Sequence, residues 1–107
     1  MKTLRIKRIY FNQIASKKKI LEARVSYPDI RDIKVGQQLR FECEYDSLVR
    51  TVISIRKYKT IEEMLNLEMI NSLLPGYSKT EARDAYNSIY SSDKIEQHGG
   101  LIVLELS

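Results

Sequence analysis

The strict alternation of residues 37–45 (QQLRFECEY) limits the fold more than any other feature of the chain. Apolar and polar side chains exchange at every step, which is typical of a strand with one buried face. Asp46 and Ser47 then favour a turn, and residues 49–58 (VRTVISIRKY) are rich in the β-branched side chains of a second strand. Strands joined by so few residues pair antiparallel. The buried face of the first strand is predicted to consist of Leu39, Phe41, Cys43 and Tyr45.

Three further segments have the composition of strands. Residues 3–6 (TLRI) form a short one, and residues 20–26 (ILEARVS) alternate again. Residues 101–107 (LIVLELS) are almost continuously apolar. Such a run is expected where a strand is paired on both sides and covered on both faces.

The helices are predicted from capping residues and from apolar spacing. Residues 8–16 (RIYFNQIAS) favour a first helix, and two more begin at pairs with the S/T-x-x-E spacing of a capping box, Thr60 with Glu63 and Ser78 with Glu81. Behind the second pair runs a single stripe at helical spacing, which we assign to the core. Its members are Ala82, Ala85, Tyr86, Ile89 and Tyr90.

The order of these elements indicates the fold class. The chain reads as strand, helix, three strands, two helices and a last strand, without repeats or a low-complexity linker. Most connections are too short for parallel crossovers. We therefore predict an α+β fold in which a mixed or antiparallel sheet curls into a small β-barrel flanked by short helices, as a single domain over residues 1–107.

Composition excludes several classes of protein. The chain is 43% hydrophobic and 30% charged, which is typical of a globular domain, and no long uncharged apolar run predicts a membrane span. Arg5, Lys7 and Arg8 interrupt the apolar residues that a signal peptide would need, so a cytoplasmic location is expected. Cys43 and His98 are the only residues of their types, so we expect no disulfide, no metal site and no cofactor.

Positive charge is concentrated at the front of the chain. Residues 1–34 hold ten lysines and arginines against three acidic residues, while residues 35–107 hold eight against eleven. The net charge of +4 therefore hides a strongly basic first third. This asymmetry favours an anionic partner such as nucleic acid, although a solvated basic surface has the same composition.

The stretch SKKKILEARV, residues 16–25, joins that positive charge to a strand. Side chains two apart on a strand point the same way with Cα atoms about 7 Å apart, so Glu22 and Arg24 project together. Lys19, at the turn into the strand, can swing to the same side. A carboxylate and a guanidinium side by side can hold a base or sugar donor together with a phosphate. The alternative is an ion pair on an exposed strand, which contributes little to stability.

The residues Lys19-Ile20-Leu21-Glu22-Ala23-Arg24 resemble the K-x-x-E-x-R core of the G-x-K-x-x-E-x-R motif of the ASCH (activating signal cointegrator homology) domain family. The resemblance extends through IKVGQQLRFE, LLPGYSKTEARDAYNSIY and GGLIVLEL in the family's order, and so over nearly the whole chain. Two positions depart from the pattern. Lys17 stands at the glycine of the motif, and Gln37 replaces the acidic residue usual after Gly36.

The resemblance implies a PUA-like β-barrel with a cleft lined by Lys19, Glu22 and Arg24, and a role in binding single-stranded RNA, a nucleotide or a nucleoside. The neighbouring cations of the basic turn are expected to add to this site, and nearby tyrosines to stack on a base. These further candidates are Lys17, Lys18, Tyr10 and Tyr77, with Tyr27 close by.

Two other functions stay open. In a hydrolase acting on RNA or on a modified nucleoside, as a ribonuclease or an amidohydrolase, Lys19 would be a base or charge stabiliser and Glu22 a general acid or base. One branch of small bacterial ASCH-like proteins, which this chain resembles in length, hydrolyses acetylated cytidine with a lysine, a threonine and a glutamate. Here the threonine position aligns with Glu22 and the glutamate position falls near Pro75, so that activity is not transferred. The third hypothesis is an interaction domain whose helical face docks a protein and whose cleft has no function.

Overall fold

The computed structural model describes residues 1–107 and contains eleven helices and strands, several of them only one turn long. In chain order they are β1 (Lys2–Arg5), α1 (Arg8–Ala15), β2 (Leu21–Val25), α2 (Pro28–Arg31), β3 (Gln38–Cys43), β4 (Asp46–Tyr58), α3 (Ile61–Leu67), α4 (Ile70–Leu73), α5 (Lys79–Ile89), α6 (Ser92–Gln97) and β5 (Leu101–Leu106).

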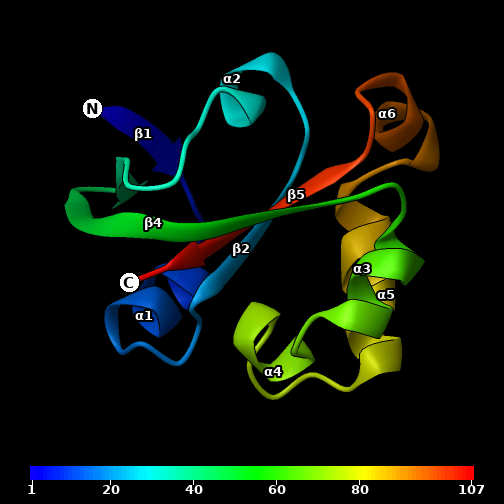
Figure 1. Cartoon of the computed structure of the whole chain (residues 1–107). Coiled ribbons are helices and arrows are strands. Elements are labelled where there is room, and N and C mark those ends of the chain that lie inside the picture. Colours follow the sequence, from blue (N-terminus) through cyan, green and yellow to red (C-terminus); the bar gives the residue numbers. More distant parts are fainter.

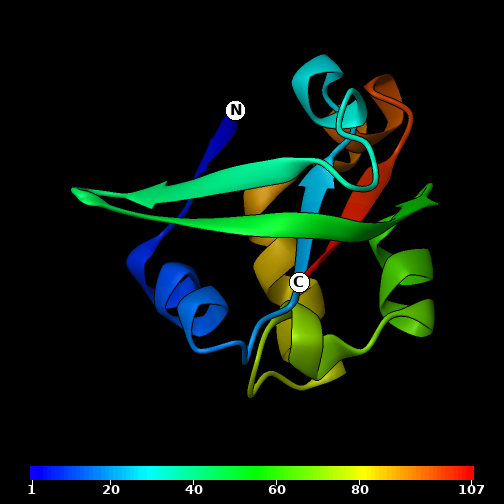
Figure 2. The ribbon, with the colours of Figure 1, turned by 60° about the vertical axis from the view of Figure 1, so that its left-hand side comes forward.

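The five strands form one sheet in the order β1-β3-β4-β5-β2. The β1–β3 pair is parallel and every other pair is antiparallel, which confirms the predicted mixed sheet. β4 is long enough to pair with β3 through its first half and with β5 through its second. A register shift between Val52 and Ser54 interrupts its pairing with β5, the kind of irregularity that bends a strand. The sheet curls into a half-barrel, and Figure 2 shows β2 and β5 crossing the β3–β4 hairpin.

Short helices flank the curled sheet (Figure 1). α3, α5 and α6 gather beside one end of β5, α1 lies near its other end, and α2 lies at the top of the view. This is the predicted α+β architecture, and it is compatible with a PUA-like barrel.

β5 is the strand that both halves of the core share. Leu101 and Val103 belong to the cluster beneath α3–α6, whereas Ile102 and Leu104 belong to the cluster inside the curl. Because side chains alternate along a strand, one apolar segment can supply both clusters. The prediction that residues 101–107 are paired and covered on both sides is confirmed.

The hairpin between β3 and β4 departs from the sequence prediction. Leu39, Phe41 and Cys43 are buried as expected, but Tyr45 is fully exposed. The chain turns at Glu44, whose φ of 53° is left-handed, so the alternation ends one residue pair early. The turn therefore precedes Asp46, which already belongs to β4.

The two predicted helix caps differ in completeness. Ser78 and Glu81 exchange both bonds of a capping box at the start of α5. At α3 the Thr60 hydroxyl accepts from the Glu63 amide, but the returning glutamate bond is missing. The sequence prediction missed α2, α4 and α6, since four to six residues are too few to show a helical stripe. None of the helices combines the length and apolar character that crossing a bilayer requires.

Candidate functional site

The motif strand β2 lies at an edge of the sheet and is nevertheless covered on both faces. It pairs with β5 alone, and α4 fixes its entrance because the Ile20 amide donates to the Ser72 carbonyl (3.2 Å). Leu21, Ala23 and Val25 face the core. On the opposite face Glu22 is only 7% exposed. The motif therefore does not form an ion pair on an exposed strand, which was the alternative left open by the sequence.

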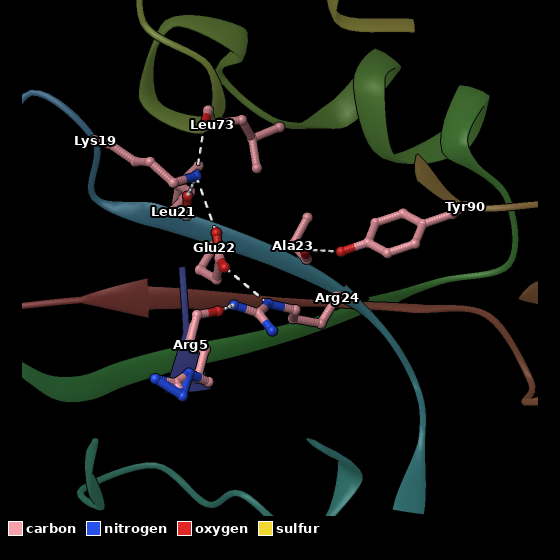
Figure 3. Close-up of polar contacts among 8 residues, drawn as sticks. All are labelled: Arg5, Lys19, Leu21, Glu22, Ala23, Arg24, Leu73 and Tyr90. Carbon is pink, nitrogen blue, oxygen red and sulfur yellow. Dashed lines mark hydrogen bonds and ion pairs between the residues drawn. The ribbon is translucent and has the colours of Figure 1, made fainter. Parts of the chain in front are cut away.

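The Lys19 ammonium is buried and uses all of its donors within the protein. It donates to the carbonyls of Leu21 and Leu73 (2.6 Å each) and lies 3.1 Å from Oε1 of Glu22 (Figure 3). The ring of Tyr10 lies 5.7 Å from the nitrogen, within range of a cation–π interaction. An ammonium has three donors, so Lys19 holds β2, α4 and Glu22 together and has none to spare.

Glu22 divides its carboxylate between two cations. Oε1 faces Lys19, and Oε2 accepts from Nε of Arg24 at 2.8 Å. Arg24 also donates through Nη2 to the carbonyl of Arg5 (3.0 Å), as Figure 3 shows, while its Nη1 has no hydrogen-bond partner. The predicted projection of Glu22 and Arg24 to one side is therefore present. The carboxylate keeps unused lone pairs, and the guanidinium keeps free donors.

Burial and charge act against each other in this cluster. Burial by itself raises the pKa of Glu22, but the charges of Lys19 and Arg24 outweigh it, so the pKa lies below its usual value. Burial lowers the pKa of Lys19 despite the neighbouring carboxylate. We conclude that Glu22 is ionised at neutral pH and that it acts as a hydrogen-bond acceptor.

A cavity of about 290 Å³ opens beside this cluster. Its walls come from the end of β1, from α1, from β2, and from one face of α5. Exposed cations stand at its rim, buried charges on one wall, and apolar and aromatic side chains on the others. The lining residues are Arg5, Ile6, Lys7, Tyr10, Lys19, Glu22, Ala23, Arg24, Leu74, Ala85, Tyr86, Ile89 and Tyr90.

Three of the lining residues are tyrosines. Tyr86 and Tyr90 stack with ring centroids 6.3 Å apart and planes 11° from parallel. The Tyr90 hydroxyl donates to the carbonyl of Ala23 (3.1 Å), which ties α5 to β2. Burial raises the pKa of Tyr90 to about 12, and burial followed by the neighbouring Tyr77 hydroxyl raises the pKa of Tyr10. All three phenols therefore stay protonated at neutral pH, since burial also raises the pKa of Tyr86.

The cavity collects some of the predicted site residues and leaves others out. Lys19, Glu22, Arg24 and Tyr10 line it. The other candidates lie around it: Lys17 and Lys18 are exposed in the turn before β2, Tyr77 is half-buried beside Tyr10, and Tyr27 packs edge-on against His98 at 4.5 Å.

The turn before β2 has the backbone conformation that glycine favours at the motif position occupied here by Lys17. Its φ is 63°, a left-handed conformation in which glycine costs least. The Lys17 amide donates to the carbonyl of Ile14 (3.0 Å), so the residue closes the C-terminus of α1. The lysine thus adopts the backbone conformation that the motif's glycine favours.

A second cavity, of about 590 Å³, lies between α3, α5 and α6 and is larger. Its charged lining residues are Lys59, Glu62, Arg83 and Glu96. Glu62 and Arg83 form an ion pair that is one-third to one-half exposed, and Lys59 and Glu96 are exposed. We give it less weight because no buried charge faces it. The structure also contains no cluster of three or more His, Cys, Asp or Glu side chains that could hold a metal ion.

Comparisons with known proteins reveal similar structures. The crystal structure of hypothetical protein PH0355 has 30% sequence identity and a TM-score of 0.89, with 100% of this chain and 98% of that chain covered. The chain belongs to the same family as PH0355. The solution NMR structure of protein PF0455 from Pyrococcus furiosus has 28% identity and a TM-score of 0.78, with 99% and 94% covered. No protein-family model matches the sequence, and no curated protein matches it.

Sequence reasoning missed part of the cavity in this PH0355-family chain. Tyr86 and Tyr90 were assigned to the core from their helical stripe, yet both line the cavity as well. The stripe could have given a signal, because it carries two hydroxyls that a purely apolar core would not accommodate without partners. Arg5 and Lys7 were missed because nothing local to residues 3–8 indicates that the end of β1 meets β2.

Proposed function

We propose that this chain is an ASCH-type domain with a PUA-like barrel, and that it binds single-stranded RNA or a nucleotide in the cavity beside β2. The observation that carries the proposal is the buried cluster of Lys19, Glu22 and Arg24 on the wall of an aromatic-lined cavity. The cytoplasmic location expected from the sequence is consistent with such a partner.

The wall chemistry suits a nucleotide. Glu22 accepts from a base amine or sugar hydroxyl, and the free donors of Arg24 suit a phosphate or a base acceptor. Tyrosine rings provide surfaces on which a base stacks irrespective of sequence. The cavity volume of about 290 Å³ lies near the lower end of the range for small-ligand sites, which fits one nucleotide unit better than a large ligand.

The rim supplies the attraction for a phosphate backbone. Arg5 and Lys7 line the cavity, are exposed, and their side chains form no ion pair. Lys17 and Lys18 stand in the exposed turn before β2. Exposed cations around a cavity favour a polyanion because each contact with a phosphate releases a counterion.

The geometry favours binding over hydrolysis. Burial lowers the pKa of Lys19 and so eases the loss of a proton, but a base or nucleophile there would have to give up a bond to Leu21, Leu73 or Glu22, which use all three donors. The lowered pKa of Glu22 makes it a poor general acid and a weak base. We therefore retain the hydrolase only as the alternative to be tested by turnover.

The proposal is tested by fluorescence anisotropy with a labelled single-stranded RNA of about ten nucleotides. We expect affinity to fall with salt and the salt slope to decrease by about one on changing Arg5→Ala or Lys7→Ala. Lys94→Ala, which removes an exposed lysine of α6 outside the cavity, is the matched control. Equal effects of all three changes would indicate nonspecific attraction, and no binding at low salt would overturn the proposal.

A further inference from the structure

Tyr86 has a buried hydroxyl without a partner. The residue is 4% exposed, and its hydroxyl is one of two buried side-chain polar atoms in the protein that lack a hydrogen bond. The side chain lines the cavity beside β2. Its charged and polar surroundings, Glu22, Tyr10 and Tyr90, line the same cavity.

This missing bond is unusual because burying an unpaired hydroxyl costs about 1–3 kcal/mol. Buried polar groups in native proteins are nearly always satisfied, so an exception calls for a physical reason. Tyr90, one helical turn later at the C-terminus of α5, has a satisfied hydroxyl, since its O–H donates to the carbonyl of Ala23. Tyr58 is also satisfied, through Glu68. Phenylalanine would pack at position 86 without the penalty, and the cavity that Tyr86 lines is the space from which a partner for the hydroxyl can come.

The two walls define what that ligand offers. The Tyr86 phenol is protonated and must donate its one proton, while the ionised Glu22 can only accept. A ligand that satisfies both presents an acceptor and a donor on one edge of a flat ring that also stacks on tyrosine. Nucleobases have this combination on their Watson–Crick edges, and a ribose or a phosphate lacks the flat ring.

We propose that the cavity takes up one unpaired nucleobase and that the Tyr86 hydroxyl donates a hydrogen bond to its edge while Glu22 accepts from it. This inference rests on the proposed function and names the part of the nucleotide that enters. Tyr86 is thus a binding residue in addition to a core residue.

The test is an NMR titration of the isotope-labelled protein with AMP, CMP, GMP and UMP in turn, and with ribose 5-phosphate, which lacks a base. We expect at least one nucleotide to bind more tightly than ribose 5-phosphate. Tyr86→Phe is expected to weaken the binding of that nucleotide about tenfold, which is the equivalent of one hydrogen bond. The affinity for ribose 5-phosphate should stay the same.

Thermal unfolding of the free protein adds a readout that needs no ligand. Tyr86→Phe is expected to leave the melting temperature unchanged or higher, because it removes an unpaired buried group. Tyr58→Phe is the matched control: it also removes the hydroxyl of a tyrosine of the core, but one that is part-buried, bonded to Glu68 and outside the cavity, so we expect it to lower the melting temperature and to leave nucleotide affinity unchanged.

The outcomes separate the inference from the proposed function. If Tyr86→Phe binds the nucleotide as tightly as the natural protein, or melts at a lower temperature, the role of Tyr86 is wrong while nucleotide binding stands. If ribose 5-phosphate binds as tightly as every nucleotide, the base does not enter the cavity. If neither class of probe binds and single-stranded RNA does not bind either, both proposals fail.

Discussion

Glu22 and Glu68 are two glutamates with little-exposed carboxylates that the chain neutralises in different ways. The Glu68 carboxylate accepts hydrogen bonds from Nε and Nη2 of Arg56, at 2.7 and 2.8 Å, and from the Tyr58 hydroxyl. Arg56 also reaches Glu105 on β5 at 2.7 Å. This cluster is closed by groups of the chain itself, and it fastens the end of α3 to the sheet.

The Glu22 cluster has the same kinds of group but is left open. Its carboxylate is split between Lys19 and Arg24, and a cavity lies against it. No cavity adjoins Glu68. The comparison teaches that a little-exposed, ion-paired carboxylate does not by itself mark a binding site. What distinguishes the motif is charge that is buried and yet retains unused hydrogen-bonding capacity facing a space.

Breaking each cluster at its cation should give the largest difference. Lys19→Met leaves Glu22 with Arg24 alone and abandons two carbonyls, so we expect a loss of about 3–5 kcal/mol in the free energy of unfolding. Arg56→Met should cost less, about 1–3 kcal/mol, because a third of the Arg56 side chain is exposed to water. Urea unfolding of the two variants measures both values, and equal losses or the reverse order would contradict the comparison.

Removing each carboxylate charge should separate the clusters by binding. Glu22→Gln is expected to weaken the binding of single-stranded RNA at least about tenfold. Glu68→Gln is expected to leave the affinity unchanged and to lower only the stability of the fold. Fluorescence anisotropy measures the affinities, and circular dichroism checks that each variant is folded.

If Glu22→Gln unfolds because Lys19 stays charged, the double change Lys19→Met with Glu22→Leu removes both charges and is expected to fold but not to bind. Similar losses of affinity for the Glu22 and Glu68 variants would break the comparison. A hydrolase would be recognised separately, as RNA or nucleoside turnover that disappears in Glu22→Gln.

Acid should weaken both clusters. The pKa of Glu22 is lowered because two cations outweigh its burial, and the pKa of Glu68 is lowered because bonds from Arg56 and Tyr58 outweigh its burial. A carboxyl with a lowered folded pKa contributes stability that is complete above the ordinary value of about 4.5 and is lost as pH falls through the folded value. Urea unfolding at neutral pH and at several values below 4.5 should show this loss. Glu22→Gln and Glu68→Gln should each flatten the curve, and an unchanged slope would remove that residue from the explanation.

The smallest difference lies in the backbone that leads to each carboxylate. Glu68 has an ordinary extended conformation, φ −101° and ψ 156°, whereas Lys17 on the way to Glu22 has a φ of 63°. Lys17→Gly should relieve a cost of roughly 1–2 kcal/mol, offset in part by the entropy of glycine, for a net gain below about 1 kcal/mol. Lys18→Gly, whose φ is not positive, should give no gain in thermal unfolding. A gain in both variants would show that side-chain charge, and not the turn, sets the effect.

The strands could be predicted because their signals are local. The alternation of Leu39, Phe41 and Cys43 and the apolar run of β5 each contain enough information to specify which faces are buried. The prediction that Tyr45 is buried was wrong because the turn begins at Glu44, and a glutamate in the sequence does not indicate a left-handed φ. The shortest helices were not predicted because they depend on packing against the rest of the protein, which a local sequence pattern does not show.

The candidate site could be predicted only along β2. The spacing of Glu22 and Arg24 is enough to put them on one face of a strand, and that prediction is confirmed by their 2.8 Å contact. Leu73, which accepts from Lys19, lies 54 residues away in the chain, and no local pattern connects the two. A larger distance in sequence separates Tyr86 from β2, with which it lines the cavity. Tertiary packing, which periodicity does not encode, decided these contacts.

Arg24 has a further consequence for the mechanics of the barrel. β1 and β2 are the two free edges of the sheet, and no backbone ladder joins them. The hydrogen bond from Arg24 to the Arg5 carbonyl links these two edges. An occupant of the cavity that draws the guanidinium away removes this link, and β1 keeps its four-residue pairing with β3 and the buried Leu4 side chain. Deuterium uptake by the amides of Lys2–Arg5 is therefore expected to rise when a ligand fills the cavity, which would report occupancy at a strand on the opposite edge of the sheet from β2.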